Sequence, residues 1–233
     1  MRLGKRPLAV AATLFVLAEV TLGVLVHTLR GAAVARVSYA AVVLAFAFCL
    51  LFMERSTDYL LTQAALLTTC AADWILVLHP DRSYLVAMCF FTGAQLLYGA
   101  RMTRLTVGRL RSVGLWLRLG LTLAAWLTAY LVAGSTVDAL ALVSLFYFAN
   151  LIVNALLAFL THTACGTLAA GFLLFLLCDI FVGFGMLGEY IPLPSSGPLA
   201  FMASPPINMA WVFYVPSQTL LALSLLPRRL GKE

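Results

Sequence analysis

Long runs of apolar residues recur along the whole chain, and they leave few folds open to it. Hydrophobic residues make up 63% of the 233 residues and charged residues only 10%, against about 45–50% and roughly 25% in soluble domains. A chain of this composition cannot cover a water-facing surface, so we expect an integral membrane protein. Because about 20 apolar residues in a helix cross a bilayer, residues 1–233 are expected to form one polytopic membrane domain.

The apolar runs predict an all-α fold of eight transmembrane helices. We place them at about 7–29, 36–53, 59–79, 84–102, 113–133, 137–160, 164–187 and 207–226. The proline-rich segment from about 188 to 206 is expected to be extended rather than helical. The five cysteines lie in or beside apolar runs and form no C-x-x-C pair, so we expect no disulfide and no zinc site. We also expect no other metal, because no ligand motif is present, and no cofactor.

The distribution of basic residues predicts the orientation. With the N-terminus inside, the outer segments hold only Arg30, Arg36 and Arg82, and Arg118 lies near the inner end of the fifth span. This asymmetry follows the positive-inside rule, so we expect both termini in the cytoplasm. The inner segments hold Arg2, Lys5, Arg6, Arg55, Arg101, Arg104, Arg109, Arg111, Arg228, Arg229 and Lys232.

The charge also indicates which partners to expect. The arginines from Arg101 to Arg111 are expected to contact anionic membrane lipids. No glycine-rich phosphate loop and no mixed aromatic and basic patch is present, so we expect no nucleic acid partner. The oligomeric state is not indicated by the sequence.

Two aspartates interrupt apolar runs at matching positions. Asp73 lies 14 residues after Tyr59, and Asp179 lies 15 residues after Ala164. At about 1.5 Å per residue, two parallel spans then hold them at nearly the same depth. An acid inside a membrane span is a candidate functional residue. No basic residue lies deep in a predicted span to pair with them, so we expect at least one to stay protonated at neutral pH, and a neutral and an ionised carboxyl form a general acid and a general base.

Other polar residues in the predicted spans are candidates for orienting a substrate. Each also has a structural interpretation: the asparagines as hydrogen bonds between helices, the tyrosines as packing, and Glu19 as packing or part of an ion route. Pro216 predicts a kink beside Gln218. The similar segments 94–97 and 217–221 suggest a parallel repeat of four helices plus four. The candidates are Glu19, Gln95, Tyr98, Tyr147, Asn150, Asn154, Tyr214 and Gln218.

Four segments of the chain resemble the YhhN/TMEM86 family, the lysoplasmalogenases. They are AALL at 64–67 with CAAD at 70–73, FFTGAQLLY at 90–98, GFLLFLLCD at 171–179, and YVPSQTLL at 214–221. The resemblance implies hydrolysis of the vinyl-ether bond of a lysoplasmalogen. The products would be a fatty aldehyde and glycerophosphoethanolamine or glycerophosphocholine. It also implies that the family's intramembrane aspartates correspond to Asp73 and Asp179.

The chain departs from the family pattern at three positions. It has Ala72 in place of glycine, Cys178 in place of serine, and Gln95 in place of histidine. The last change matters most for chemistry, because glutamine forms hydrogen bonds but cannot carry a charge or shuttle a proton.

Three functions therefore stay open at this point. The first is an intramembrane lysoplasmalogenase in the cell membrane of a bacterium, acting on a lysophospholipid. The second is a lipid-binding or transport protein, since paired acids, a repeat and a kinked helix also suit a proton-coupled carrier. The third is a member of the same fold that has lost the hydrolase activity, which Gln95 would allow.

Overall fold

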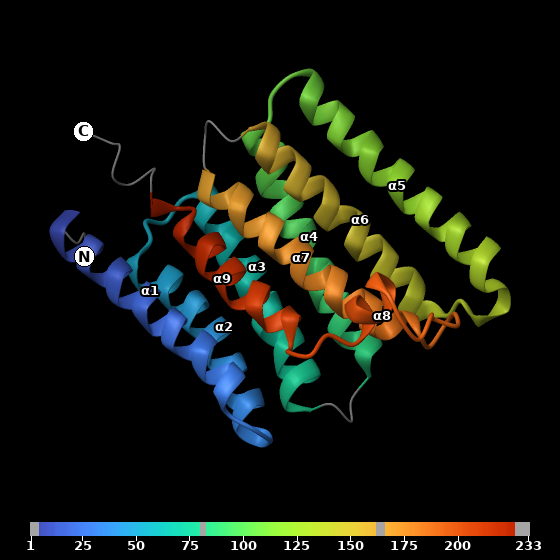
Figure 1. The fold of residues 1–233 in the computed structure, drawn as a ribbon. Helices are drawn as coiled ribbons and strands as arrows, with labels where there is room; N and C mark the ends of the chain where they lie inside the picture. Colours follow the sequence, from blue (N-terminus) through green and yellow to red (C-terminus); the bar gives the residue numbers. More distant parts are fainter. Residues whose placement is uncertain (1–4, 80–82, 162–165, 227–233) are drawn as a thin grey trace.

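The computed structural model describes residues 5–79, 83–161 and 166–226, and within these ranges all regular structure is helical. The long helices lie side by side and alternate in direction (Figure 1). They are α1 (Lys5–Thr28), α2 (Ala32–Phe52), α3 (Thr57–Asp73), α4 (Tyr84–Leu105), α5 (Arg109–Ala133), α6 (Ala139–Leu160), α7 (Gly166–Leu187) and α9 (Met209–Leu223).

Seven stretches of the described chain are long and apolar enough to cross a membrane. The expected eighth span is the apolar helix α9, which has only 15 residues. At 1.5 Å per residue it is about 22 Å long, short of the roughly 30 Å of a bilayer core. The integral membrane character is confirmed, whereas the number of eight spans and the orientation of the termini stay predictions.

Two segments differ from the expected structure. The proline-rich loop contains a short helix, α8 (Pro198–Ala203), which begins at a proline. Proline is favoured in the first helical turn, where its missing N–H group has no partner to lose. The third span changes from α-helix to a π-helical turn at Trp74–Leu78, directly after Asp73. Such turns are frequent at functional sites.

Local signals in the sequence place several helix ends. The side chain of Ser56 accepts a hydrogen bond from the amide of Tyr59, and that of Asp138 accepts one from the amide of Ala141, as N-caps do. Gly108 and Gly134 have φ of 57° and 59° and bracket α5. A left-handed conformation is open to glycine at no steric cost, so α5 is set off by a sharp turn at each end.

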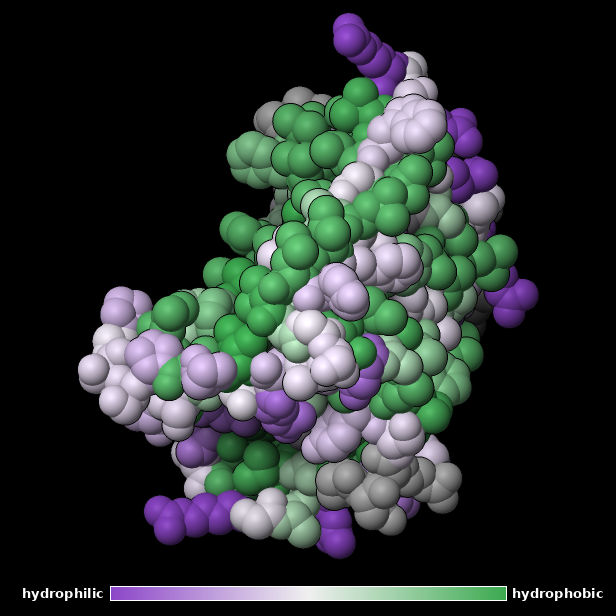
Figure 2. All heavy atoms as spheres, turned by 90° about the vertical axis from the view of Figure 1, so that its right-hand side faces the viewer, coloured by the Kyte–Doolittle hydropathy of each residue, from purple (hydrophilic) through white to green (hydrophobic). Residues whose placement is uncertain are grey.

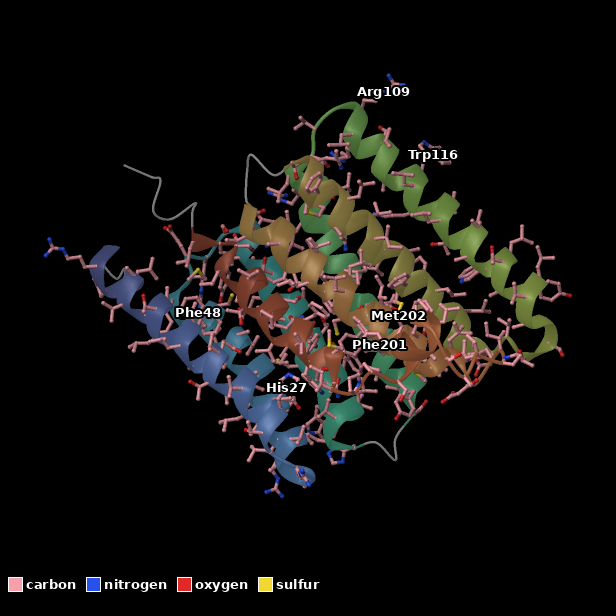
Figure 3. All side chains as sticks on the ribbon, in the orientation of Figure 1. His27, Phe48, Arg109, Trp116, Phe201 and Met202 are labelled. Carbon is pink, nitrogen blue, oxygen red and sulfur yellow. The ribbon has the colours of Figure 1, made fainter. Side chains whose placement is uncertain are left out.

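The helices differ in how deeply they sit in the bundle. The main core joins α3, α4, α6, α7 and α9, and a second cluster joins α1 and α2 to α3 and α9. Helix α5 packs mainly against α6 and stands at one side of the bundle (Figure 1). The side of the molecule that α5 forms is broadly hydrophobic (Figure 2), and Trp116 points away from the bundle (Figure 3). These features suit a helix that faces lipid.

Some expected features fall outside the described residues. They are Arg2, Arg82, Arg228, Arg229 and Lys232 of the orientation argument, and the first two residues of the seventh predicted span. Among the arginines expected at lipid head groups, Arg101 is instead buried, and its Nη1 donates to the Ser224 hydroxyl at 2.7 Å. The α4 face that carries it turns toward the end of α9 rather than toward the membrane.

Candidate active site

Asp73 occupies the last position of α3, where the helix changes to the π-helical turn. The residue is 2% exposed. The hydroxyl of Tyr214 on α9 donates to Asp73 Oδ2 at 2.5 Å. Helix α9 therefore fixes the direction of this carboxyl group.

Asp179 has an equivalent arrangement on α7. The hydroxyl of Tyr147 on α6 donates to Asp179 Oδ2. The side chain is half-buried rather than fully buried. Each of the two acids therefore has one tyrosine donor, supplied by a different helix.

The structure brings the two aspartates to one cavity of about 1830 Å³. Asp73, Asp179, Tyr147 and Tyr214 all line it. The cavity lies toward the end of the bundle where α1, α3, α5 and α7 finish, and Met202 of α8 is part of its wall (Figure 3). The match in depth that the sequence predicts thus corresponds to one shared site.

The rest of the described lining is almost entirely apolar or aromatic. Two of the rings beside the acids are Phe91, which packs on Tyr147, and Trp211, which packs edge-on against Tyr214. No lysine, arginine or histidine occurs among the described residues of the lining, and its two acids are the aspartates. The cavity therefore suits an aliphatic chain and offers no cation to a phosphate.

The mouth of the cavity carries one further polar contact outside the spans. The hydroxyl of Tyr190 donates to Asp138 Oδ1 at 3.1 Å. Burial, with the neighbouring Asp138 carboxylate, raises the pKa of Tyr190 to about 12. The phenol therefore stays neutral at physiological pH and ties the segment after α7 to the start of α6.

Three residues expected to contact substrate instead form a separate polar cluster around Arg118. The Arg118 guanidinium donates to Asn150 Oδ1 at 2.9 Å and to Asn154 Oδ1 at 2.7 Å. Asn154 Nδ2 donates in turn to Gln95 Oε1 at 2.9 Å. None of these residues lines the cavity. The stripe on α6 is therefore divided: Tyr147 faces the aspartates, and the asparagines one and two turns further on bind α5 and α4.

The sequence did not indicate this role for Arg118, which we placed near the inner end of the fifth span. Its side chain is half-buried and reaches the interior of the helix layer, with the guanidinium close beside Gly99. The two asparagines on the next helix were the only available signal. The guanidinium finds its acceptors in the amide oxygens of the two asparagines and in the Asn150 carbonyl oxygen.

The other three candidates also lie outside the described lining. Tyr98 is fully buried and packs edge-on against Phe172. Gln218 and Glu19 are buried between helices. Helical periodicity shows that a polar residue is on a given helix, but it does not show which neighbour that face meets.

Comparison with known proteins places the chain in a family. A search of the curated proteins and a search of the solved structures each find no match. The model of the YhhN family matches residues 35–225, which includes every helix from α3 to α9 and both aspartates. The chain belongs to the YhhN family.

Proposed function

We propose that this protein is an intramembrane hydrolase that cleaves the vinyl-ether bond of a lysoplasmalogen, in the cell membrane of a bacterium. Asp73 and Asp179 act as the acid–base pair. The observation that carries the proposal is the placement of two tyrosine-bound carboxyl groups in one apolar cavity. Membership of the YhhN family supports the same reaction class.

The chemistry needs both carboxyl groups. A neutral carboxyl protonates the vinyl ether at its β-carbon, which gives an oxocarbenium ion. The ionised partner stabilises this cation and takes a proton from the attacking water. In the collapse of the hemiacetal, the first carboxyl, now ionised, takes the hydroxyl proton, and its protonated partner gives a proton to the leaving glycerol oxygen. The products are a fatty aldehyde and glycerophosphoethanolamine or glycerophosphocholine, and each carboxyl returns to its starting state.

The cavity suits the lipid chain better than the head group. Its apolar wall takes the alkenyl chain, and the aromatic rings around the aspartates exclude bulk water from the oxocarbenium ion. The phosphate finds no cation in the described lining. We therefore place the phosphate at the mouth, in contact with water, with the vinyl-ether bond at the aspartates.

The position of Gln95 agrees with retained activity. In the family pattern this position is a histidine, but here it bonds to Asn154 and lies outside the described cavity lining. A change from histidine to glutamine at this position alters the Arg118 cluster rather than the groups that meet the substrate.

The test is aldehyde release from a lysoplasmalogen by the purified protein in detergent. We expect release by the wild-type protein and a loss of about 10²- to 10⁴-fold in Asp73→Asn and in Asp179→Asn, the usual contribution of a general acid or base. Glu189→Gln makes the same chemical change at an exposed site outside the cavity lining and should keep full activity.

The same preparation separates the competing functions. An ester lysolipid should release no aldehyde and serves as a substrate control. Binding of the lysoplasmalogen by the wild-type protein without any aldehyde would contradict the hydrolase and favour a lipid-binding protein. Transfer of lipid across sealed vesicles without turnover would favour a carrier.

A further inference from the structure

Helix α1 carries one ionisable residue inside the bundle, and that residue lies outside the segment that matches the family. Glu19 is the sole ionisable residue between Arg6 and His27. It is 2% exposed, and neither of its carboxyl oxygens has a hydrogen-bond partner within the described ranges. A buried polar group without a partner is costly and calls for a missing proton, water or ligand.

Helix α9 presents a second group in the same condition. Gln218 is 1% exposed, and both Oε1 and Nε2 of its amide lack a partner in the part of the chain that the structure describes. Val215, Gln218 and Ala222 recur on one face of α9, which is the face turned to α1 and α2. This face therefore places an amide where α1 packs.

A contact between α1 and α9 sets the two groups at the same level. A Cβ atom on Gly23 would lie 3.7 Å from Val215 Cγ1. The two helices are antiparallel (Figure 1). One turn back along α1 from Gly23 is Glu19, and about one turn forward along α9 from Val215 is Gln218. The carboxyl and the amide are thus at the same level on facing sides of the two helices, and no direct hydrogen bond joins them in the structure.

The contacts of α2 with α1 and α9 independently place Glu19 and Gln218 at the same height along the bundle. The ring of Phe15 on α1 stacks on Phe48 of α2 at 4.2 Å, and Phe48 lies between the two helices (Figure 3). Next to it, Cys49 Sγ lies 3.6 Å from the carbonyl oxygen of Ala222 on α9. One turn outward from these contacts, α2 presents the fully buried Ala45, which offers no polar group.

The hydrogen-bonding capacity of the pair identifies what is missing. An ionised carboxyl has only acceptors, so it would use the amide N–H and leave the amide oxygen opposed by negative charge. A neutral carboxyl donates its O–H to Gln218 Oε1 and accepts from Nε2, which satisfies all four atoms. We propose that Glu19 holds a proton and pairs with the Gln218 amide, directly or through one water, in a buried site that fastens α1 to α9.

The titratable groups around this site do not supply a competing charge. Helix α1 packs on α2 and α9. On α2 the nearest titratable side chain is Cys49, which lies one helical turn after Ala45. Its thiol turns to the Ala222 carbonyl. On α9 it is Tyr214, about one turn outward, which bonds to Asp73. The pairing of Glu19 with Gln218 therefore depends on the proton of the Glu19 carboxyl group and not on a neighbouring charge.

A consequence for the active site rests on the proposed function. Gln218 lies one turn from Tyr214 on α9. By fastening α9 to α1, the pair of Glu19 and Gln218 holds the tyrosine against Asp73, which makes Glu19 a positioning residue. Loss of the pair should reduce kcat for aldehyde release while leaving KM nearly unchanged, because the cavity itself is not altered.

Infrared spectra and thermal unfolding test the site without any substrate. In the difference spectrum between wild type and Glu19→Gln, we expect loss of a carbonyl band of a neutral carboxyl at neutral pH. The exchanged variant, Glu19→Gln with Gln218→Glu, should restore the band. Glu19→Ala and Gln218→Leu should lower the unfolding temperature in detergent, whereas Glu19→Gln and the exchanged variant should stay near wild type.

Any one of three results would overturn the proposal. They are a carboxylate band in place of the neutral carbonyl band, an unfolding temperature of Gln218→Leu equal to wild type, and a destabilisation of Glu19→Gln as large as that of Glu19→Ala. None of these depends on lipid hydrolysis. A protein that shows the band but releases no aldehyde would keep this site and contradict the proposed function.

Discussion

At the scale of single residues, the site depends on how each carboxyl group is held. Asp73 and Asp179 come from α3 and α7, and their tyrosine donors come from α9 and α6. Four helices must therefore be in place before the two acids share one cavity. A lysine or arginine would neutralise the charge of a carboxylate. A tyrosine hydroxyl only orients the carboxyl group, which therefore stays free to exchange protons with a substrate.

Removal of either hydroxyl tests this arrangement. In Tyr214→Phe and in Tyr147→Phe we expect kcat for aldehyde release to fall about 10- to 100-fold, since a hydrogen bond to a charged group contributes about 1.5–3 kcal/mol. Steady-state kinetics on the purified variants give the values. Tyr130→Phe, at an exposed position on α5, is the control, and activity equal to wild type in both site variants would show that the tyrosines do not orient the acids.

The sequence identified the acids but not all of their surroundings. The depths of Asp73 and Asp179 follow from counting residues along two parallel spans, and both line the cavity. Asn150 and Asn154 share a stripe with Tyr147, yet they turn to Arg118. The difference arises because a residue's partner depends on the rotation and spacing of the neighbouring helix, which periodicity does not contain.

At the scale of elements, the close approach of α7 and α9 positions Tyr214. Gly171 faces Leu221, and a Cβ atom there would lie 3.0 Å from Leu221 Cγ and 3.1 Å from its backbone nitrogen. The backbone atom cannot rotate away. Small residues of this kind let membrane helices pack closely, so the glycine sets the distance between these two helices.

We expect Gly171→Ala to destabilise the protein by about 1–3 kcal/mol, the usual cost of overpacking. Thermal unfolding in detergent measures the change. Gly183→Ala on the same helix is the control, because nothing lies within 4 Å of its Cβ position. Equal unfolding temperatures for the two variants would contradict the close approach.

The elements that the sequence predicted least well are those that depart from regular α-helix. The boundaries of the long helices follow the apolar runs to within a few residues. The π-helical turn at Trp74–Leu78 lies in a run without glycine or proline, so no local signal marks it. Helix α8 lies among prolines that suggested an extended chain, and its first residue is one of them.

At the scale of the whole molecule, the short helix α9 decides the topology. If it completes the eighth crossing, as the basic residues predict, both termini lie in the cytoplasm. Reporter fusions at the two ends measure this, and we expect a cytoplasmic signal from each. A cytoplasmic N-terminus with an external C-terminus would show that α9 enters the membrane without crossing it.

The cavity depends on the arrangement of the whole bundle. It is bounded by helices from both halves of the chain, so the arrangement of the whole bundle, rather than any one motif, brings two acids into an apolar space. The predicted 4+4 repeat would explain why α3 and α7 run in the same direction. Catalysis by this pair is the central claim, and it requires transfer of a solvent-derived proton to carbon.

The most direct test is the mass of the aldehyde that the protein releases from a lysoplasmalogen in D₂O. Protonation of the β-carbon by an exchangeable carboxyl predicts one deuterium beside the aldehyde carbon, and this labelled product should be lost in both Asp73→Asn and Asp179→Asn. Authentic aldehyde incubated with the protein corrects for later exchange. Unlabelled aldehyde, or labelled aldehyde at the wild-type rate from either variant, would contradict the account.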